Sequence, residues 1–110
     1  MHPFFNAAKR VAFNGDSKRK FKLGAIGIRQ DGATVSACNL PDRAPSPHAH
    51  AEARVLKKLG RGGTIYVVRI LSDGSFANAR PCKTCQMLMR SHDVVKCYYS
   101  INDNEYGVLQ

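Results

Sequence analysis

Two short segments of this chain carry side chains suited to one metal ion, although they lie far apart in the sequence. The first is the His-Ala-Glu segment 50–52, and the second is the Pro-Cys-Lys-Thr-Cys segment 81–85. One imidazole and two thiolates are ligands that zinc prefers, but a structural zinc ion normally takes four protein ligands. Three ligands leave the fourth position to water, and zinc lowers the pKa of that water to about 7. The fold must therefore bring two distant segments together around one ion.

His50, Cys82 and Cys85 are the predicted zinc ligands, with one zinc ion per chain. Glu52 follows the histidine by two positions and is predicted to ligate nothing. A carboxylate next to such an ion can accept and donate the protons that hydrolysis of an amine requires. Cys82 and Cys85 are three residues apart, so they share one face of a helix. The pattern thus predicts a hydrolytic metal site with Glu52 as its catalytic group.

Two other interpretations of these residues remain open. A C-x-x-C pair can be a redox pair or half of a structural zinc site. The redox interpretation makes the His-x-Glu pattern a coincidence, and a structural site with His48 as fourth ligand leaves Glu52 without a role. We therefore interpret His48 as a loop residue near the mouth of the site. Cys38 and Cys97 lie in apolar, strand-like runs and are interpreted as buried cysteines.

The composition of the 110 residues, 44% of them hydrophobic, is that of one domain spanning 1–110. Seventeen Lys and Arg against eight Asp and Glu give a net charge of +9, which favours anionic partners such as nucleotides or nucleic acid. Arg54, Lys57, Lys58 and Arg61 recur at helical spacing and predict a basic helix face, which would equally be an ordinary solvated face. Four cysteines without a secretory segment or a membrane-length apolar run indicate a cytoplasmic protein.

Hydrophobic periodicity and turn residues predict an alternation of helices and strands. The expected helices cover residues 3–13, 49–59 and 81–92, and the expected strands cover 21–29, 33–39, 64–71, 94–101 and 106–109, with a loop at 72–80. The strand–helix–strand unit 64–101 predicts two parallel strands joined by a crossover. Both ligand segments would then lie in first helical turns at one end of a central mixed sheet, where positive helix ends favour thiolates.

The two segments, in this order, resemble the H-x-E and P-C-x-x-C signature of zinc-dependent nucleobase deaminases. The whole chain resembles the cytidine deaminase-like superfamily, and residues 17–25 and 37–39 resemble the opening of free-nucleoside cytidine deaminases. The resemblance implies an α/β protein with a three-layer α/β/α cytidine deaminase-like fold. Its mixed five-stranded sheet would have helices on both faces and an antiparallel last strand. The resemblance also implies that Asn39 binds the substrate sugar, that Phe21 lines the pocket, and that the backbone at Ala51 meets the base edge.

The sequence contains conflicting evidence on the substrate. Free-nucleoside enzymes usually have cysteine as the first ligand, whereas this chain has His50, as deoxycytidylate, tRNA-adenosine and polynucleotide cytidine deaminases do. Pro41 also replaces a glutamate that accepts a sugar hydroxyl in the free-nucleoside enzymes. The positive charge also favours a phosphorylated or polymeric substrate. The short segment after Ile101 indicates instead an antiparallel last strand, as in the nucleoside branch. Tyr99 could supply an aromatic wall for a base, although a core position is equally open.

We therefore predict a zinc-dependent hydrolytic deaminase that converts cytosine to uracil in a nucleoside or nucleotide. A polynucleotide cytidine deaminase acting on single-stranded DNA or RNA is the alternative, and a non-catalytic, zinc-stabilised nucleic-acid-binding module is a second one. The resemblance to nucleoside-type enzymes, which complete their sites with neighbouring subunits, also predicts a homo-oligomer.

Overall fold

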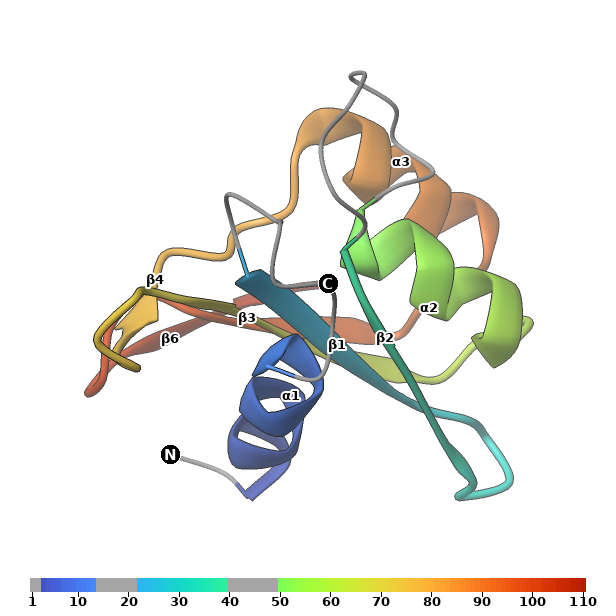
Figure 1. Cartoon of the computed structure of the whole chain (residues 1–110). Helices are drawn as coiled ribbons and strands as arrows, with labels where there is room; N and C mark the ends of the chain where they lie inside the picture. Colours follow the sequence, from blue (N-terminus) through green and yellow to red (C-terminus); the bar gives the residue numbers. More distant parts are fainter. Residues whose placement is uncertain (1–2, 14–21, 40–49) are drawn as a thin grey trace.

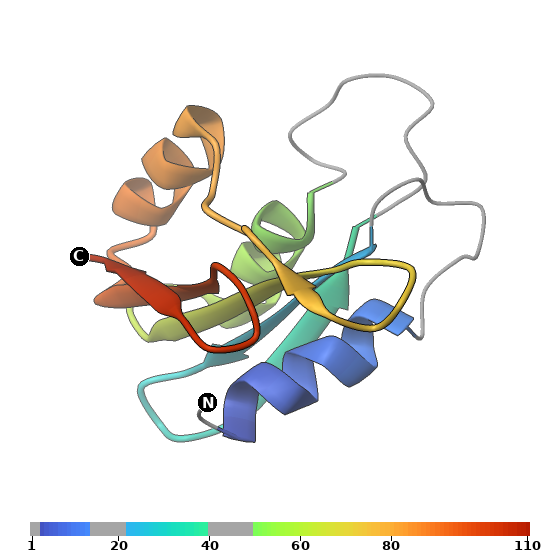
Figure 2. The same ribbon diagram turned by 90° about the vertical axis from the view of Figure 1, so that its left-hand side faces the viewer.

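A mixed β-sheet lies at the centre of the structure, and helices cover both of its faces (Figure 1 and Figure 2). The computed structural model describes residues 3–13, 22–39 and 50–110. Its strands are β1 (Lys22–Ile28), β2 (Thr34–Cys38), β3 (Thr64–Ile70), β4 (Phe76–Ala77), β5 (Lys96–Ser100) and β6 (Tyr106–Leu109). Its helices are α1 (Pro3–Phe13), α2 (Ala51–Leu59) and α3 (Lys83–Ser91). The predicted three-layer α/β/α architecture is confirmed.

The sheet order is β2-β1-β3-β5-β6, with both antiparallel and parallel pairs. β1 pairs antiparallel with β2 and β3, β3 pairs parallel with β5, and β6 returns antiparallel along β5. The predicted strand–helix–strand unit is present, because α3 lies between the parallel strands β3 and β5 in the chain. The antiparallel last strand is confirmed as well.

One strand was not expected, because β4 lies in the segment 72–80 that the sequence predicts to be a loop. The chain turns at Gly74, whose φ of 88° suits glycine, and β4 then pairs antiparallel with the end of β3. The Asp73 carboxylate accepts the Ser75 N–H at 2.9 Å and stabilises this turn. The loop prediction was wrong here, since a two-residue strand is too short to show an alternating pattern.

α1 covers one face of the sheet. Phe5, Ala8 and Ala12 recur at intervals of three and four residues, so they share one helix face, and all three are buried. They belong to a buried cluster whose sheet members are Ile26, Tyr66, Val68 and Ile70. Gly24 of β1 allows the α1 backbone to approach closely, because a Cβ at this position would lie 2.1 Å from the Ala8 carbonyl oxygen.

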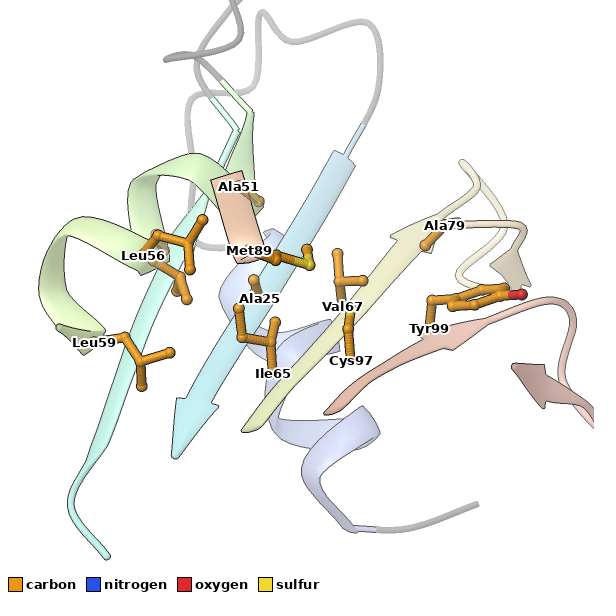
Figure 3. Close-up of a cluster of buried hydrophobic side chains, with 12 residues drawn as sticks. Ala25, Ala51, Leu56, Leu59, Ile65, Val67, Ala79, Met89, Cys97 and Tyr99 are labelled. Atoms are coloured by element: carbon orange, nitrogen blue, oxygen red, sulfur yellow. The ribbon is translucent and has the colours of Figure 1, made fainter. Parts of the chain in front are cut away.

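α2 and α3 cover the opposite face. Figure 3 shows Leu56 and Leu59 of α2 and Met89 of α3 grouped with Ile65 and Val67 of β3 in one buried cluster. Helices of nine residues are marginal on their own, so this burial stabilises them, at about 1.5–3 kcal/mol per large apolar side chain. No helix in the described part of the chain is long and apolar enough to cross a membrane.

Two of the four residues of the expected basic face bind the edge strand β2. Arg54 Nη1 donates to the Cys38 carbonyl at 2.6 Å, and Lys58 Nζ donates to the Ser36 carbonyl at 2.7 Å. Unpaired backbone groups on an edge strand can pair with another chain, and charged side chains at the edge prevent this. Arg54 and Lys58 therefore have a structural role in addition to their charge.

Replacing Gly24 with alanine is expected to lower the free energy of unfolding by about 2 kcal/mol or more, because overpacking typically costs about 1–3 kcal/mol. The new Cβ would lie 2.1 Å from the Ala8 oxygen and 2.7 Å from the Ala12 nitrogen, and backbone atoms cannot rotate away. Gly27→Ala in the same strand is the matched control, since its Cβ would meet only side-chain atoms, the nearest at 3.0 Å. Urea unfolding measures both variants, and equal stabilities would contradict the close approach of α1.

Candidate metal centre

His50 and Cys82 are the N-cap residues of α2 and α3. Both have extended backbone angles, with φ −71° and ψ 146° for His50 and φ −68° and ψ 167° for Cys82, as N-cap residues usually do. Neither side chain makes a capping hydrogen bond to its own helix, so the imidazole and the thiol are available to other groups. Cys85 follows within the first turn of α3.

The two helices begin two residues later than the sequence predicts, at Ala51 instead of 49 and at Lys83 instead of 81. Pro81 therefore precedes the N-cap of α3, and its carbonyl accepts a hydrogen bond from Gln86 Nε2 at 2.8 Å. The predicted location of the ligands in first helical turns is right only for Cys85. The other two ligands lie just outside, because an N-cap residue keeps extended backbone angles that the helix itself cannot adopt.

The three predicted ligand atoms lie close enough to share one ion. His50 Nδ1 is 3.3 Å from Cys85 Sγ and 3.8 Å from Cys82 Sγ, and all three atoms lie within 4.8 Å of one another. Tetrahedral zinc, with bonds of about 2.0–2.1 Å to nitrogen and about 2.3 Å to sulfur, holds nitrogen and sulfur about 3.6 Å apart. The observed separations lie on either side of that value. Both the donor set and the nitrogen–sulfur spacing therefore fit zinc.

Glu52 lies beside these atoms without being one of the three. Glu52 is only 3% exposed, and its Oε1 has no hydrogen-bond partner among the described residues. Burial raises the pKa of Glu52, although its own backbone N–H, the charge of His50 and the Cys85 thiol oppose the shift. Leaving a buried polar group unpaired costs about 1–3 kcal/mol, so such groups usually have a functional explanation. A cation or a bound substrate next to Oε1 would satisfy this carboxyl group.

The surroundings of Cys85 disfavour a free thiolate. Burial raises the pKa of the Cys85 thiol well above its usual range, and the charge of Glu52 and the nearby Cys82 add to the effect. The N-terminus of α3, which the sequence predicts to favour a thiolate, is outweighed by this burial. A bound divalent cation reverses the balance, because a coordinating thiol loses its proton. Cys85 is buried and Cys82 is exposed, so the group of ligands is open to solvent at Cys82.

Cys97 lies near this group, but the structure places it in the core. It is 2% exposed, and burial followed by the charge of Glu52 raises its pKa well above the usual range for a thiol. The prediction of a buried Cys97 is confirmed. Cys38, at the end of β2, is only half-buried, so the corresponding prediction was wrong in degree. An edge strand has a neighbouring strand on one side only, and this exposes its side chains more than those of a central strand.

Asn39, the predicted sugar-binding residue, lies near the start of α2. Its backbone N–H donates to the Leu23 carbonyl at 3.1 Å, and its side-chain Oδ1 accepts the Leu23 N–H at 3.0 Å. The Cys38 carbonyl next to it accepts the hydrogen bond from Arg54 Nη1, and the Arg54 N–H donates to the His50 carbonyl at 3.1 Å. Two bonds thus connect the end of β2 with the helix start that carries His50. No local sequence pattern signals this role of Arg54, because it depends on a contact between distant segments.

The other predicted substrate-binding residues have different surroundings. Ala51 is fully buried as the first residue of α2. Tyr99 of β5 is 7% exposed, and its hydroxyl accepts a hydrogen bond from Arg80 Nη1 at 3.1 Å. Arg80 immediately precedes the second ligand segment, and the sequence analysis did not identify it. Phe21 and His48 lie outside the described residues.

Comparisons with known proteins agree with this geometry. The family model for the cytidine and deoxycytidylate deaminase zinc-binding region matches residues 1–101. The solved structure of cytidine deaminase from Burkholderia pseudomallei is similar, with a TM-score of 0.72 at 20% identity over 99% of this chain and 91% of that chain. Cytidine deaminase from Mycobacterium leprae gives a TM-score of 0.67 at 19% identity, over 94% and 88% of the two chains. A comparison with the curated proteins found no match.

At these identities the likeness to solved structures establishes the fold alone. The match to the family model extends over both ligand segments and almost the whole chain. The structure also gathers the histidine and the two cysteines of those segments around one point. The chain therefore belongs to the cytidine and deoxycytidylate deaminase family.

Proposed function

We propose that this protein is a zinc-dependent hydrolytic deaminase that converts cytosine to uracil in a nucleoside or nucleotide. One observation carries the proposal. The buried Glu52 carboxyl, whose Oε1 has no partner among the described residues, lies beside a histidine and two cysteines that can hold a metal. Membership of the deaminase family and the similarity to solved structures named as cytidine deaminases support the choice of base.

His50, Cys82 and Cys85 would hold one zinc ion per chain. Three protein ligands and an open position distinguish a catalytic zinc site from a structural one. Bound zinc supplies a water molecule whose pKa is lowered to about 7, and hence a nucleophile at neutral pH. Substrate would approach from the side of Cys82, because that ligand is exposed whereas Cys85 is buried.

Glu52 would move the protons of the reaction. Deamination replaces the exocyclic amino group by oxygen, so a neighbouring group must accept a proton from water and deliver protons to the ring nitrogen and the leaving ammonia. Burial raises the pKa of Glu52, which lets the carboxyl group hold a proton more readily than an exposed glutamate does. Oε1, which no described residue engages, is the oxygen atom proposed for this transfer.

Asn39, Ala51, Phe21 and Tyr99 are the proposed substrate contacts. The connection of the end of β2 to the start of α2 through Arg54 supports a position for Asn39 beside the site. Tyr99 is 7% exposed, so only a small part of its ring can reach a base. The single domain spanning 1–110 and the cytoplasmic location stay predictions from the sequence.

Glu52→Ala is expected to lower kcat by about 10²–10⁴-fold while the protein keeps one zinc per chain, because Glu52 moves protons and does not ligate. Cys85→Ala is the contrasting variant and should lose both zinc and activity. Elemental analysis measures the zinc content, and ammonia release measures the turnover. Activity of Glu52→Ala close to that of the wild type would refute the catalytic role, and loss of its zinc would show that Glu52 is a ligand.

A screen for ammonia release over cytidine, deoxycytidine, their monophosphates, adenosine and short single-stranded oligonucleotides separates the candidate substrates. The cytosine nucleosides or mononucleotides should react with a shallow salt dependence, because a mononucleotide engages only one or two basic groups. For a polynucleotide, the logarithm of the binding affinity should instead fall against the logarithm of the salt concentration with a slope of about −0.7 per phosphate neutralised. Turnover of oligonucleotides alone would indicate a polynucleotide deaminase. Zinc-dependent binding of oligonucleotides without any turnover would indicate the non-catalytic module.

We also propose a homo-oligomer. β6 is an edge strand with exposed Tyr106 and Val108, and a pocket beside it is lined in part by Met89 and Leu109. Light scattering at moderate salt should give at least twice the mass of one chain, and Val108→Lys should lower that mass. Leu71→Lys, at another exposed apolar residue outside β6, is the control. A strictly monomeric wild type would refute the proposal.

A further inference from the structure

The segment that leads from β4 to the two cysteines is bound to β5 through two neighbouring residues. The Ala79 N–H donates to the Ser100 carbonyl at 2.8 Å, and Ala79 is buried. Arg80 Nη1 donates to the Tyr99 hydroxyl at 3.1 Å, and the guanidinium lies 5.9 Å from the centroid of the Tyr99 ring. Cys82 follows Arg80 by two residues. These contacts with β5 therefore determine where the second ligand segment begins.

The Tyr99 ring is held in turn by β6. Tyr99 and Gly107 are cross-strand partners. A Cβ at Gly107 would lie 2.2 Å from Cζ and 2.3 Å from the hydroxyl oxygen of Tyr99. The ring thus lies directly over the glycine, and any side chain at position 107 would displace the hydroxyl that Arg80 binds. Gly107 does not have a positive φ, so its backbone conformation does not require glycine. The close approach of the Tyr99 ring requires it instead.

We propose that Tyr99 and Arg80 are positioning residues that hold Cys82 and Cys85 in the geometry that the metal requires, and that Gly107 provides the space for Tyr99. This inference rests on the proposed function, because it assigns the three residues to the zinc site. It accounts for an exposed arginine bound to a buried tyrosine directly beside the ligand segment. It also accounts for a glycine in the middle of β6.

Tyr99→Phe tests the inference, because it removes only the hydroxyl that Arg80 binds. Tyr98→Phe is the matched control, since Tyr98 lies on the opposite face of the sheet and stacks on Tyr66 with ring centroids 4.8 Å apart. Removing a residue that orients a metal ligand typically weakens metal affinity by about 10–100-fold. Tyr99→Phe should therefore weaken Zn²⁺ affinity by about tenfold or more in competition with a chelator. It should also change the visible spectrum of the Co²⁺-substituted protein, and Tyr98→Phe should do neither.

Arg80→Met completes a double-mutant cycle with Tyr99→Phe. Both variants remove the same hydrogen bond, so the double variant should bind Zn²⁺ about as tightly as either single variant. Additive losses, or a Tyr99→Phe protein with wild-type affinity and an unchanged Co²⁺ spectrum, would overturn the inference and leave the zinc site intact. A wild-type protein that binds neither Zn²⁺ nor Co²⁺ would overturn the inference and the proposed function together. Urea unfolding of each variant ensures that folded proteins are compared.

Discussion

A carboxyl group enclosed beside two cysteines and a histidine is the constraint on which the rest of the structure depends. Burial raises the pKa of Glu52 and of Cys85, and the charge of Glu52 raises the pKa of the Cys85 thiol further. A divalent cation among the three ligand atoms reverses this, because it favours the thiolates and compensates the carboxylate. The three ligands, Glu52 and the cation are therefore stable together, whereas the buried carboxyl and thiol groups are unfavourable without the cation. The fold must for that reason place the ligand atoms and the Glu52 carboxyl accurately.

The topology provides this accuracy by binding each ligand segment to a strand through an arginine. Arg54 connects the start of α2 to the Cys38 carbonyl of β2, and Arg80 connects the approach to α3 to the Tyr99 hydroxyl of β5. The two strands lie on opposite sides of β1 and β3 in the sheet. The two ligand segments are thus held in place by different strands of one sheet. A shift of either helix would break a hydrogen bond to a strand as well as separate the ligand atoms.

The sequence predicted those parts of the structure that depend on local patterns. The ligands are recognisable from their spacing, and α1 and β3 from hydrophobic periodicity, because each pattern lies within a few consecutive residues. β4 could not be predicted, since two residues show no period and the pairing depends on a turn. The bonds made by Arg54 and Arg80 join residues 16 and 19 positions apart. Only the folded sheet brings such residues together. The sequence therefore shows that Arg54 and Arg80 are basic, but not that they bind a strand.

The same contacts affect how the net charge of +9 bears on the choice of substrate. Arg54 and Lys58 bind carbonyl groups of β2, Arg61 pairs with Asp93, and Arg80 binds Tyr99. Arg54, Lys58 and Arg80 thus have hydrogen-bond partners within the fold, and a polyanion could engage them fully only by competing with those bonds. Association with a polynucleotide requires several basic groups that follow its backbone, whereas one phosphate or sugar requires one or two. These side chains are therefore no independent argument for a polymeric substrate.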